Sequence, residues 1–255
     1  MTASREEPLL LVNGYAATGA DWDPIFLTAL GRSHRVICAG NRGLGGPELG
    51  DVKLTIDLMA SDLETLLDER GIKRLPVVGW SMGGFIAQRL AERAPARVTA
   101  LALIATDPGG PGAIEAEPEV WARLVDHGGT PREQATRLLA LLFPAPLATG
   151  IDRQFGEVVA AGRAQLPTAV LCAQEAAMEA WHREERPLPQ AGEGPPALIL
   201  HGEDDVVIPA ANAELLARRW PGAGLETFAG CGHAVMAQEP QRVAAAIREL
   251  LRSGA

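Results

Sequence analysis

The sequence predicts an α/β fold: a mostly parallel, doubly wound sheet of about six to eight strands with a helical cap insertion. Short, continuous apolar runs alternate with segments whose apolar residues recur at helical spacing. This alternation is typical of strands that are buried on both faces and joined by crossover helices. It stops near Asp107 and resumes near Pro196, so we expect one long helical segment to interrupt a single core.

The first half of the chain supplies four predicted strands and three predicted helices. Thr55 is placed as the N-cap of a helix whose apolar residues recur every three or four positions, and Gly71 ends it. Pro95 stops the helix that begins after Ser81. The predicted strands cover residues 9–12, 35–39, 76–78 and 98–105, and the predicted helices cover about 22–30, 56–70 and 82–94.

The stretch from Asp107 to about Gly194 opens with glycines and prolines and then shows helical patterns without a clear strand. Thr130 is a predicted N-cap, followed by a proline at the first helical position. The helical patterns cover 118–126, 131–143 and 169–181; beyond them, strands are predicted at 196–201 and 224–228 and helices at 210–220 and 239–251. We therefore expect a core made of residues 1–107 and 191–255, with a helical cap at 108–190.

Composition narrows the classes of function. The chain has 255 residues and a formal net charge of −9, which argues against a nucleic-acid partner. Residues 1–8 lack the basic and apolar regions of a signal peptide, and no later apolar run reaches the length of a membrane span. We expect a cytoplasmic protein that acts on a small molecule and does not bind membranes; a homo-oligomer is left open.

The three cysteines, Cys38, Cys172 and Cys231, are odd in number and far apart. Their spacing argues against a disulfide framework and against a zinc site, and we expect neither a metal nor a cofactor. We interpret Cys38 and Cys172 as small buried apolar residues. Cys231 is interpreted as a small residue in a tight turn, with a redox-sensitive thiol as the alternative.

The segment Gly79-Trp80-Ser81-Met82-Gly83 lies between a predicted strand and a predicted helix. A strand that turns sharply into a helix needs residues without a Cβ where its two limbs approach, and the two glycines meet this need. The turn would expose the serine hydroxyl and place the Met82 backbone N–H at a helix N-terminus, where an anion is favoured. The pattern predicts a nucleophilic serine; a glycine-rich connection with an incidental serine is the alternative.

A serine hydroxyl becomes nucleophilic when a histidine, itself oriented by a carboxylate, removes its proton. Of five histidines, His233 alone lies in a glycine-bracketed loop just after the last predicted strand. Asp204 and Asp205 lie in the loop after the penultimate strand. Because functional loops gather at the carboxyl ends of parallel strands, we expect these groups to meet Ser81 at one edge of the sheet.

With a serine, an acid and a histidine in that order, the chain resembles serine enzymes of the α/β-hydrolase fold, in the branch of esterases, enol-lactonases and cofactor-free haloperoxidases. The resemblance covers nearly the whole chain apart from the cap. It implies that Asp205 is the acid, because residues 202–209 match the family pattern Gly-x-x-Asp-x-x-hydrophobic-Pro. Asp107 is a more distant candidate, since some relatives place the acid there.

The family's second oxyanion donor follows a His-Gly pair, and this chain has Asn13-Gly14-Tyr15 instead. The resemblance implies that the backbone N–H groups of Tyr15 and Met82 form the oxyanion hole, whereas Asn13 departs from the family histidine. The mechanism implied is two-step acyl transfer, in which the histidine takes the serine proton and water then releases the acid.

The expected function is that of a serine hydrolase cleaving a small, largely apolar carboxylic ester or lactone. A perhydrolase or cofactor-free haloperoxidase and a carbon–carbon bond hydrolase on the same triad stay open. From another class, a hydrolase-like ligand receptor also stays open. Packing alone would explain the large apolar side chains near the expected site, but five of them are candidates for the substrate pocket: Trp80, Trp121, Phe143, Met178 and Trp181.

Overall fold

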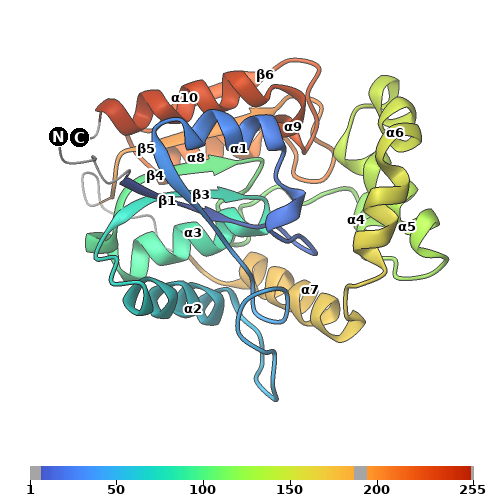
Figure 1. Ribbon diagram of the computed structural model, residues 1–255, viewed down its shortest axis with the longest axis horizontal. Helices are drawn as coiled ribbons and strands as arrows, with labels where there is room; N and C mark the ends of the chain where they lie inside the picture. The colour runs from blue at the N-terminus through green and yellow to red at the C-terminus, as the bar shows by residue number, and fades with distance from the viewer. Residues whose placement is uncertain (1–6, 187–193, 254–255) are drawn as a thin grey trace.

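The computed structural model describes residues 7–186 and 194–253, in which six strands form one sheet with helices on both faces (Figure 1). The strands lie in the order β2-β1-β3-β4-β5-β6, and every neighbouring pair is parallel. Their bounds are Glu7–Val12 (β1), His34–Ala39 (β2), Leu75–Trp80 (β3), Val98–Ile104 (β4), Ala197–Gly202 (β5) and Gly224–Phe228 (β6). The predicted α/β fold is confirmed, and the six strands stand at the lower end of the expected number.

Both faces of the sheet are buried, which is why its central strands are continuously apolar. In β1, Leu10 packs in the apolar cluster on one face, while Leu9 and Leu11 pack in the cluster on the other. Val77 and Val78 of β3 divide between the two faces in the same way. All five side chains are at most 1 % exposed, so each contributes about 2 kcal/mol by removing apolar surface from water.

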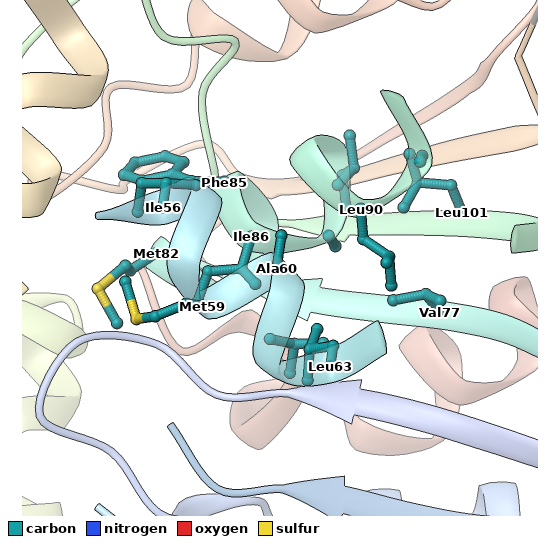
Figure 2. Packing of buried hydrophobic residues seen from close by; sticks show 14 of the residues in the cluster. Ile56, Met59, Ala60, Leu63, Val77, Met82, Phe85, Ile86, Leu90 and Leu101 are labelled. Carbon is teal, nitrogen blue, oxygen red and sulfur yellow. The ribbon is translucent and has the colours of Figure 1, made fainter. Parts of the chain in front are cut away.

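Helices α2 (Ile56–Glu69), α3 (Met82–Arg93) and α8 (Asn212–Arg219) contribute to one apolar cluster, and α1 (Pro24–Gly31) and α10 (Pro240–Ser253) contribute to the other. Figure 1 shows α1 and α10 together on the side of the sheet opposite α2 and α3. Figure 2 shows side chains of α2 interleaved with those of α3 above β3 and β4, among them Ile56, Met59, Met82, Phe85 and Ile86. The remaining short helices are η1 (Gly19–Asp21), η2 (Pro95–Arg97) and α9 (Val235–Gln238).

The predicted helix ends have clear local causes. The Thr55 side chain accepts a hydrogen bond from the Leu58 N–H at 3.0 Å and caps α2. Gly71, with φ of +64°, follows the C-terminus of the same helix in the left-handed conformation that glycine tolerates. Helix α1 begins at Pro24, two residues later than expected, because Asp23 caps it through bonds to two backbone N–H groups.

The described residues between β4 and β5 hold four helices: α4 (Pro118–Leu124), α5 (Pro131–Leu142), α6 (Ala145–Arg163) and α7 (Thr168–Arg183). In Figure 1, α4, α5 and α6 lie beyond one end of the sheet, while α7 lies beside α2. Thr130 and Glu133 form the capping box predicted at the start of α5. Helix α6 was not predicted. The division of the chain into a core and a cap stays a prediction.

Two of the cysteine interpretations differ from the structure. Cys231 is buried, as a small residue in a turn should be, but Cys172 is exposed and Cys38 is only half-buried. Both cysteines lie on elements with one face toward solvent, and the identity of a single residue does not tell which face its side chain takes.

None of the helices in the described ranges is long and apolar enough to cross a bilayer.

Candidate active site

The strand order reverses between β1 and β3, so the loops that follow these two strands diverge from one point at the carboxyl edge of the sheet. Such a switch point is where open α/β sheets bind ligands. The loop after β1 carries Tyr15 and the turn after β3 carries Ser81. The loops after β4, β5 and β6 reach the same edge and carry Asp107, Asp205 and His233.

Ser81 occupies a strained position in the sharp turn between β3 and α3. Its φ of +56° is in a region that side-chain-bearing residues rarely adopt. Two glycines make the turn possible because they lack a Cβ: one at Gly79 would lie 2.4 Å from the Gly83 carbonyl oxygen across the turn, and one at Gly83 would lie 2.1 Å from the Val12 carbonyl oxygen at the end of β1. The Ser81 N–H donates to the Ile104 carbonyl at 3.0 Å, which fixes the turn to the end of β4.

The loop after β1 lies against this turn. A Cβ added to Gly14 would stand 3.2 Å from the Ser81 Cβ, so the backbone of Tyr15 passes close to the serine. Within the described chain, neither the Tyr15 N–H nor the Met82 N–H has a hydrogen-bond acceptor. Asn13 is buried; its amide donates to the Ala39 carbonyl and accepts from the Trp22 indole, so this residue holds the loop in place.

Asp205 and His233 form a hydrogen-bonded pair at the same edge. His233 Nδ1 lies 2.8 Å from Asp205 Oδ2, and both residues are buried. The other carboxylate oxygen accepts from the backbone N–H groups of Val207 and Ile208, each at 2.9 Å. Asp204, the neighbouring candidate, is exposed, so the structure brings Asp205 and not Asp204 to His233.

Burial alone would raise the pKa of Asp205, but the imidazoles of His233 and His201 more than offset it and lower that pKa to about 2. His201 is fully buried at the end of β5, with its Nε2 at 2.9 Å from the Ile208 carbonyl oxygen and 3.3 Å from Asp205 Oδ2. Sequence reasoning missed this second imidazole, although His201 precedes Asp205 by four residues across a tight turn.

The loop that carries His233 is tied to its neighbours through the backbone. The Trp80 indole N–H donates to the His233 carbonyl at 3.0 Å, and the rings of these two residues lie 5.7 Å apart. The Ala234 N–H donates to the carbonyl of Leu142 at the end of α5. The loop of His233 is therefore held both by Trp80, which precedes Ser81, and by the end of α5.

Asp107 pairs with a different histidine. Its Oδ2 lies 3.0 Å from His182 Nε2 on α7, and its Oδ1 accepts from the Gly109 N–H at 2.8 Å. Burial tends to lower the pKa of His182, but the hydrogen bond and charge of Asp107, together with the charge of Glu115, raise it above its ordinary value. Asp107 was a candidate acid from the sequence, but its pairing with His182 was not predicted.

A cavity of about 680 Å³ lies over the carboxyl edge and is bordered by Ser81, His233, Asp107 and His182. Four of the five candidate pocket residues line it, namely Trp80, Trp121, Phe143 and Met178. The expectation for Trp181 differs from the structure: this side chain is 1 % exposed and stacks on Phe85 with ring centroids 5.2 Å apart, below the cavity wall. Trp181 shares a core cluster with the cavity-lining Met178 three residues earlier, so helical spacing in the sequence could not separate the core residue from the cavity residue.

Helix α7 also holds the loop after β1. The Tyr15 hydroxyl donates to Glu175 at 2.5 Å, and the Ala16 N–H donates to the Gln174 side chain at 2.9 Å. Ala16 has a φ of +55°, so these bonds hold a strained backbone segment beside Ser81.

Glu175 is also one of three side chains in the described ranges whose ligand atoms lie within 4.8 Å of one another, with His127 and Cys172. The Glu175 carboxylate already accepts from Tyr15 and lies 2.8 Å from His127 Nε2. Through these contacts, the Glu175 carboxylate is already engaged in linking α7 to the loop after β1.

The chain is similar to known proteins over most of its length. A model of the alpha/beta hydrolase fold matches residues 7–240. The chain is 28 % identical to a 2-hydroxymuconate semialdehyde hydrolase from Pseudomonas sp. strain CF600, over 96 % of this chain and 86 % of that protein. It is 30 % identical to a pimeloyl-[acyl-carrier protein] methyl ester esterase from Aromatoleum aromaticum, over 69 % of this chain and 73 % of that protein.

The structure of the enol-lactonase from Burkholderia xenovorans LB400 has a TM-score of 0.81 to this one at 22 % identity and covers 99 % of this chain and 94 % of its own, a likeness of fold. The match to the family model covers most of the strands and helices described above, including all six strands of the sheet. The chain is therefore an enzyme of the α/β hydrolase fold family.

Proposed function

We propose that this enzyme cleaves a small, largely apolar carboxylic ester or lactone through an acyl-enzyme on Ser81. The proposal rests on one observation. A serine at a strained strand-to-helix turn borders the same cavity as His233, whose Nδ1 is hydrogen-bonded to a buried aspartate. A histidine bound in this way through Nδ1–H keeps the Nε2 lone pair free to accept a proton.

In the first step, the Ser81 oxygen attacks the carbonyl carbon while His233 Nε2 takes the hydroxyl proton. The low pKa of Asp205 keeps its carboxylate charged beside the imidazolium that forms. His233 then gives the proton to the departing alkoxide, and the acyl group remains on Ser81. In the second step, His233 takes a proton from water and the hydroxide attacks the acyl carbon. His233 then returns this proton to the Ser81 oxygen as its bond to the acyl carbon breaks, so the carboxylic acid leaves and the serine hydroxyl is restored.

The oxyanion of each tetrahedral intermediate is held by the backbone N–H groups of Tyr15 and Met82. Both lack an acceptor among the described residues, and the Met82 N–H is at the N-terminus of α3, where the helix dipole favours negative charge. Removing one such donor slows an enzyme by roughly 10² to 10³. Because these donors are backbone groups, side-chain substitution does not test them directly.

The lining of the cavity supports a small substrate with a large apolar part. Most of its side chains are aliphatic or aromatic, and its volume of about 680 Å³ is in the usual range for small-molecule sites. The similarity to a methyl ester esterase agrees with ester chemistry.

Replacing Ser81 tests the proposal most directly. We expect Ser81→Ala to lower kcat/KM for 4-nitrophenyl butyrate by roughly 10⁴-fold or more, because no other group can form the acyl-enzyme. A fluorophosphonate probe should label the wild-type protein at Ser81 and leave the variant unlabelled. The matched control is Ser61→Ala on α2, outside the cavity lining, which should leave both readouts unchanged. Turnover retained by Ser81→Ala, with an unchanged melting temperature, would contradict the proposal.

Hydrolysis of a carbon–carbon bond is a second candidate. The relative that covers 96 % of this chain is named as the hydrolase of a semialdehyde, and that name contains no ester. A vinylogous diketone assayed beside 4-nitrophenyl butyrate separates the two reactions. A kcat/KM for the diketone that is 100-fold above that for the ester would favour the second candidate.

A further inference from the structure

Arg163 has an unusual environment for a buried cation. It lies in the last turn of α6, is 9 % exposed and lines the cavity that contains Ser81. Its Nε is sealed from solvent and has no hydrogen-bond partner, and no carboxylate among the described residues lies within 4.0 Å of the guanidinium. Burial accordingly lowers the pKa of Arg163.

The other arginines with a buried, unpartnered Nε all differ in one respect: each forms an ion pair through another guanidinium nitrogen. Arg97 pairs with Asp68 at 2.8 Å, and Arg219 pairs with Glu92 at 2.6 Å. The remaining members of this group with a carboxylate partner are Arg89, Arg137 and Arg186. Arg163 is therefore the exception among the described residues in this group, and it is the one that lines the cavity.

Acids near Arg163 are occupied by other groups. Asp21 accepts from the Thr18 N–H and hydroxyl, while Glu175 accepts from Tyr15 and lies 2.8 Å from His127. Both carboxylates act on Arg163 through space. A buried charge without a direct partner destabilises the fold, and a bound ligand of opposite charge would supply the missing partner.

Resting on the proposed function, we propose that Arg163 binds a carboxylate carried by the substrate, so that the enzyme selects esters or lactones with an acidic acyl chain. The guanidinium presents two parallel N–H donors that match a carboxylate. A single guanidinium at the negative C-terminal end of a helix suits a monoanion better than a phosphate dianion. The largely apolar wall then surrounds the hydrocarbon part between the reacting carbonyl and the carboxylate.

Two esters of equal acyl length test this assignment: mono-4-nitrophenyl glutarate, which carries a carboxylate, and 4-nitrophenyl pentanoate, which does not. We expect wild-type kcat/KM to be at least about tenfold higher for the glutarate. Arg163→Met should lower kcat/KM for the glutarate by about 30-fold or more, mainly through KM, and change that for the pentanoate by less than threefold. Arg163→Lys, which keeps the charge but loses the fork, should give an intermediate loss.

Two further readouts separate a substrate-binding role from a structural one. Arg153→Met, on the exposed part of the same helix, is the matched control and should change neither ester. The melting temperature of Arg163→Met should rise by about 2 °C or more, because a buried charge without a partner is removed. A structural arginine would give a lower melting temperature and equal losses on both esters, and that result would overturn the proposal.

The two proposals fail differently. If the enzyme hydrolyses the pentanoate but shows no preference for the glutarate, the ester hydrolase stands and the carboxylate site does not. If neither ester is hydrolysed, titration with free glutarate decides the matter. Saturable glutarate binding that weakens about tenfold or more in Arg163→Met supports the carboxylate site, and binding that is absent or equal in both proteins overturns it.

Discussion

The cavity has two walls that are built in different ways. On one wall, Ser81, Asp205 and His233 stand on short turns at strand ends. Each is held by a hydrogen bond that involves a backbone group: Ser81 N–H to the Ile104 carbonyl, the Val207 N–H to the Asp205 carboxylate, and the Trp80 indole to the His233 carbonyl. On the other wall, helices α4 to α7 present mainly apolar side chains, with few polar links to the sheet. The first wall is suited to holding reacting groups to within fractions of an ångström, and the second is suited to selecting the shape and charge of a substrate.

The two histidine–aspartate pairs make this difference concrete. Asp205 is held by two backbone N–H groups and lies near two imidazoles, whereas Asp107 is held by one backbone N–H and pairs with a histidine from α7. Both pairs reach the same cavity. If each wall has the role proposed here, disrupting the first pair should affect turnover, and disrupting the second should mainly affect how α7 is attached.

The largest expected effect comes from comparing Asp205→Asn with Asp107→Asn. We expect Asp205→Asn to lower kcat for 4-nitrophenyl butyrate by roughly 10³ to 10⁴, because the amide no longer selects the productive histidine tautomer or stabilises the imidazolium. Asp107→Asn should change kcat by less than about tenfold. Steady-state kinetics at neutral pH would measure both. Losses of similar size in the two variants would mean that the pairs are not specialised.

The first wall could be predicted from sequence because its determinants are local. A glycine turn between a strand and a helix marked Ser81, and glycines around His233 marked a loop after the last strand. The sheet was predictable for the same reason: strands buried on both faces are continuously apolar. The choice of Asp205 required the family pattern, since Asp204 occupies an equivalent place in the same loop.

The second wall could not be predicted in the same way, because tertiary contacts determine it. Helix α6 contains three glycines, which lower its helix propensity. At one of them, Gly156, the Arg132 guanidinium packs 2.5 Å from the place where a Cβ would stand, a contact that the sequence does not reveal. The pairing of His182 with Asp107 joins residues 75 positions apart. The place of Trp181 depends on its stacking against Phe85 of α3, a residue far away in the sequence.

Trp181 and Trp121 allow a second comparison, between a buried face and a cavity face of the helices. We expect Trp181→Ala to lower the free energy of unfolding by about 3 kcal/mol, because it removes an aromatic side chain that stacks on Phe85 and lies 3.2 Å beneath the Arg186 guanidinium. Trp121→Ala, at a half-buried position in the cavity lining, should lower it by less than about 1 kcal/mol and raise KM for an apolar ester. Urea denaturation with ester kinetics would test both, and equal destabilisation would contradict the assignment.

The smallest expected effect concerns pH and the His182–Asp107 pair. Because the folded protein raises the pKa of His182, the pair stabilises the fold fully below the unfolded value near 6.5, and this contribution is lost as pH rises through the higher folded value. The melting temperature of wild type should therefore exceed that of Asp107→Asn by more at pH 5.5 than at pH 8.5. We expect this gap, the difference in melting temperature between the two proteins, to change by about 2 °C between the two pH values. In a His182→Gln background the same substitution should give a gap that does not depend on pH. A gap that widens toward pH 8.5 would mean that His182 is neutral in the pair, and α7 would then be joined to the sheet by an uncharged hydrogen bond.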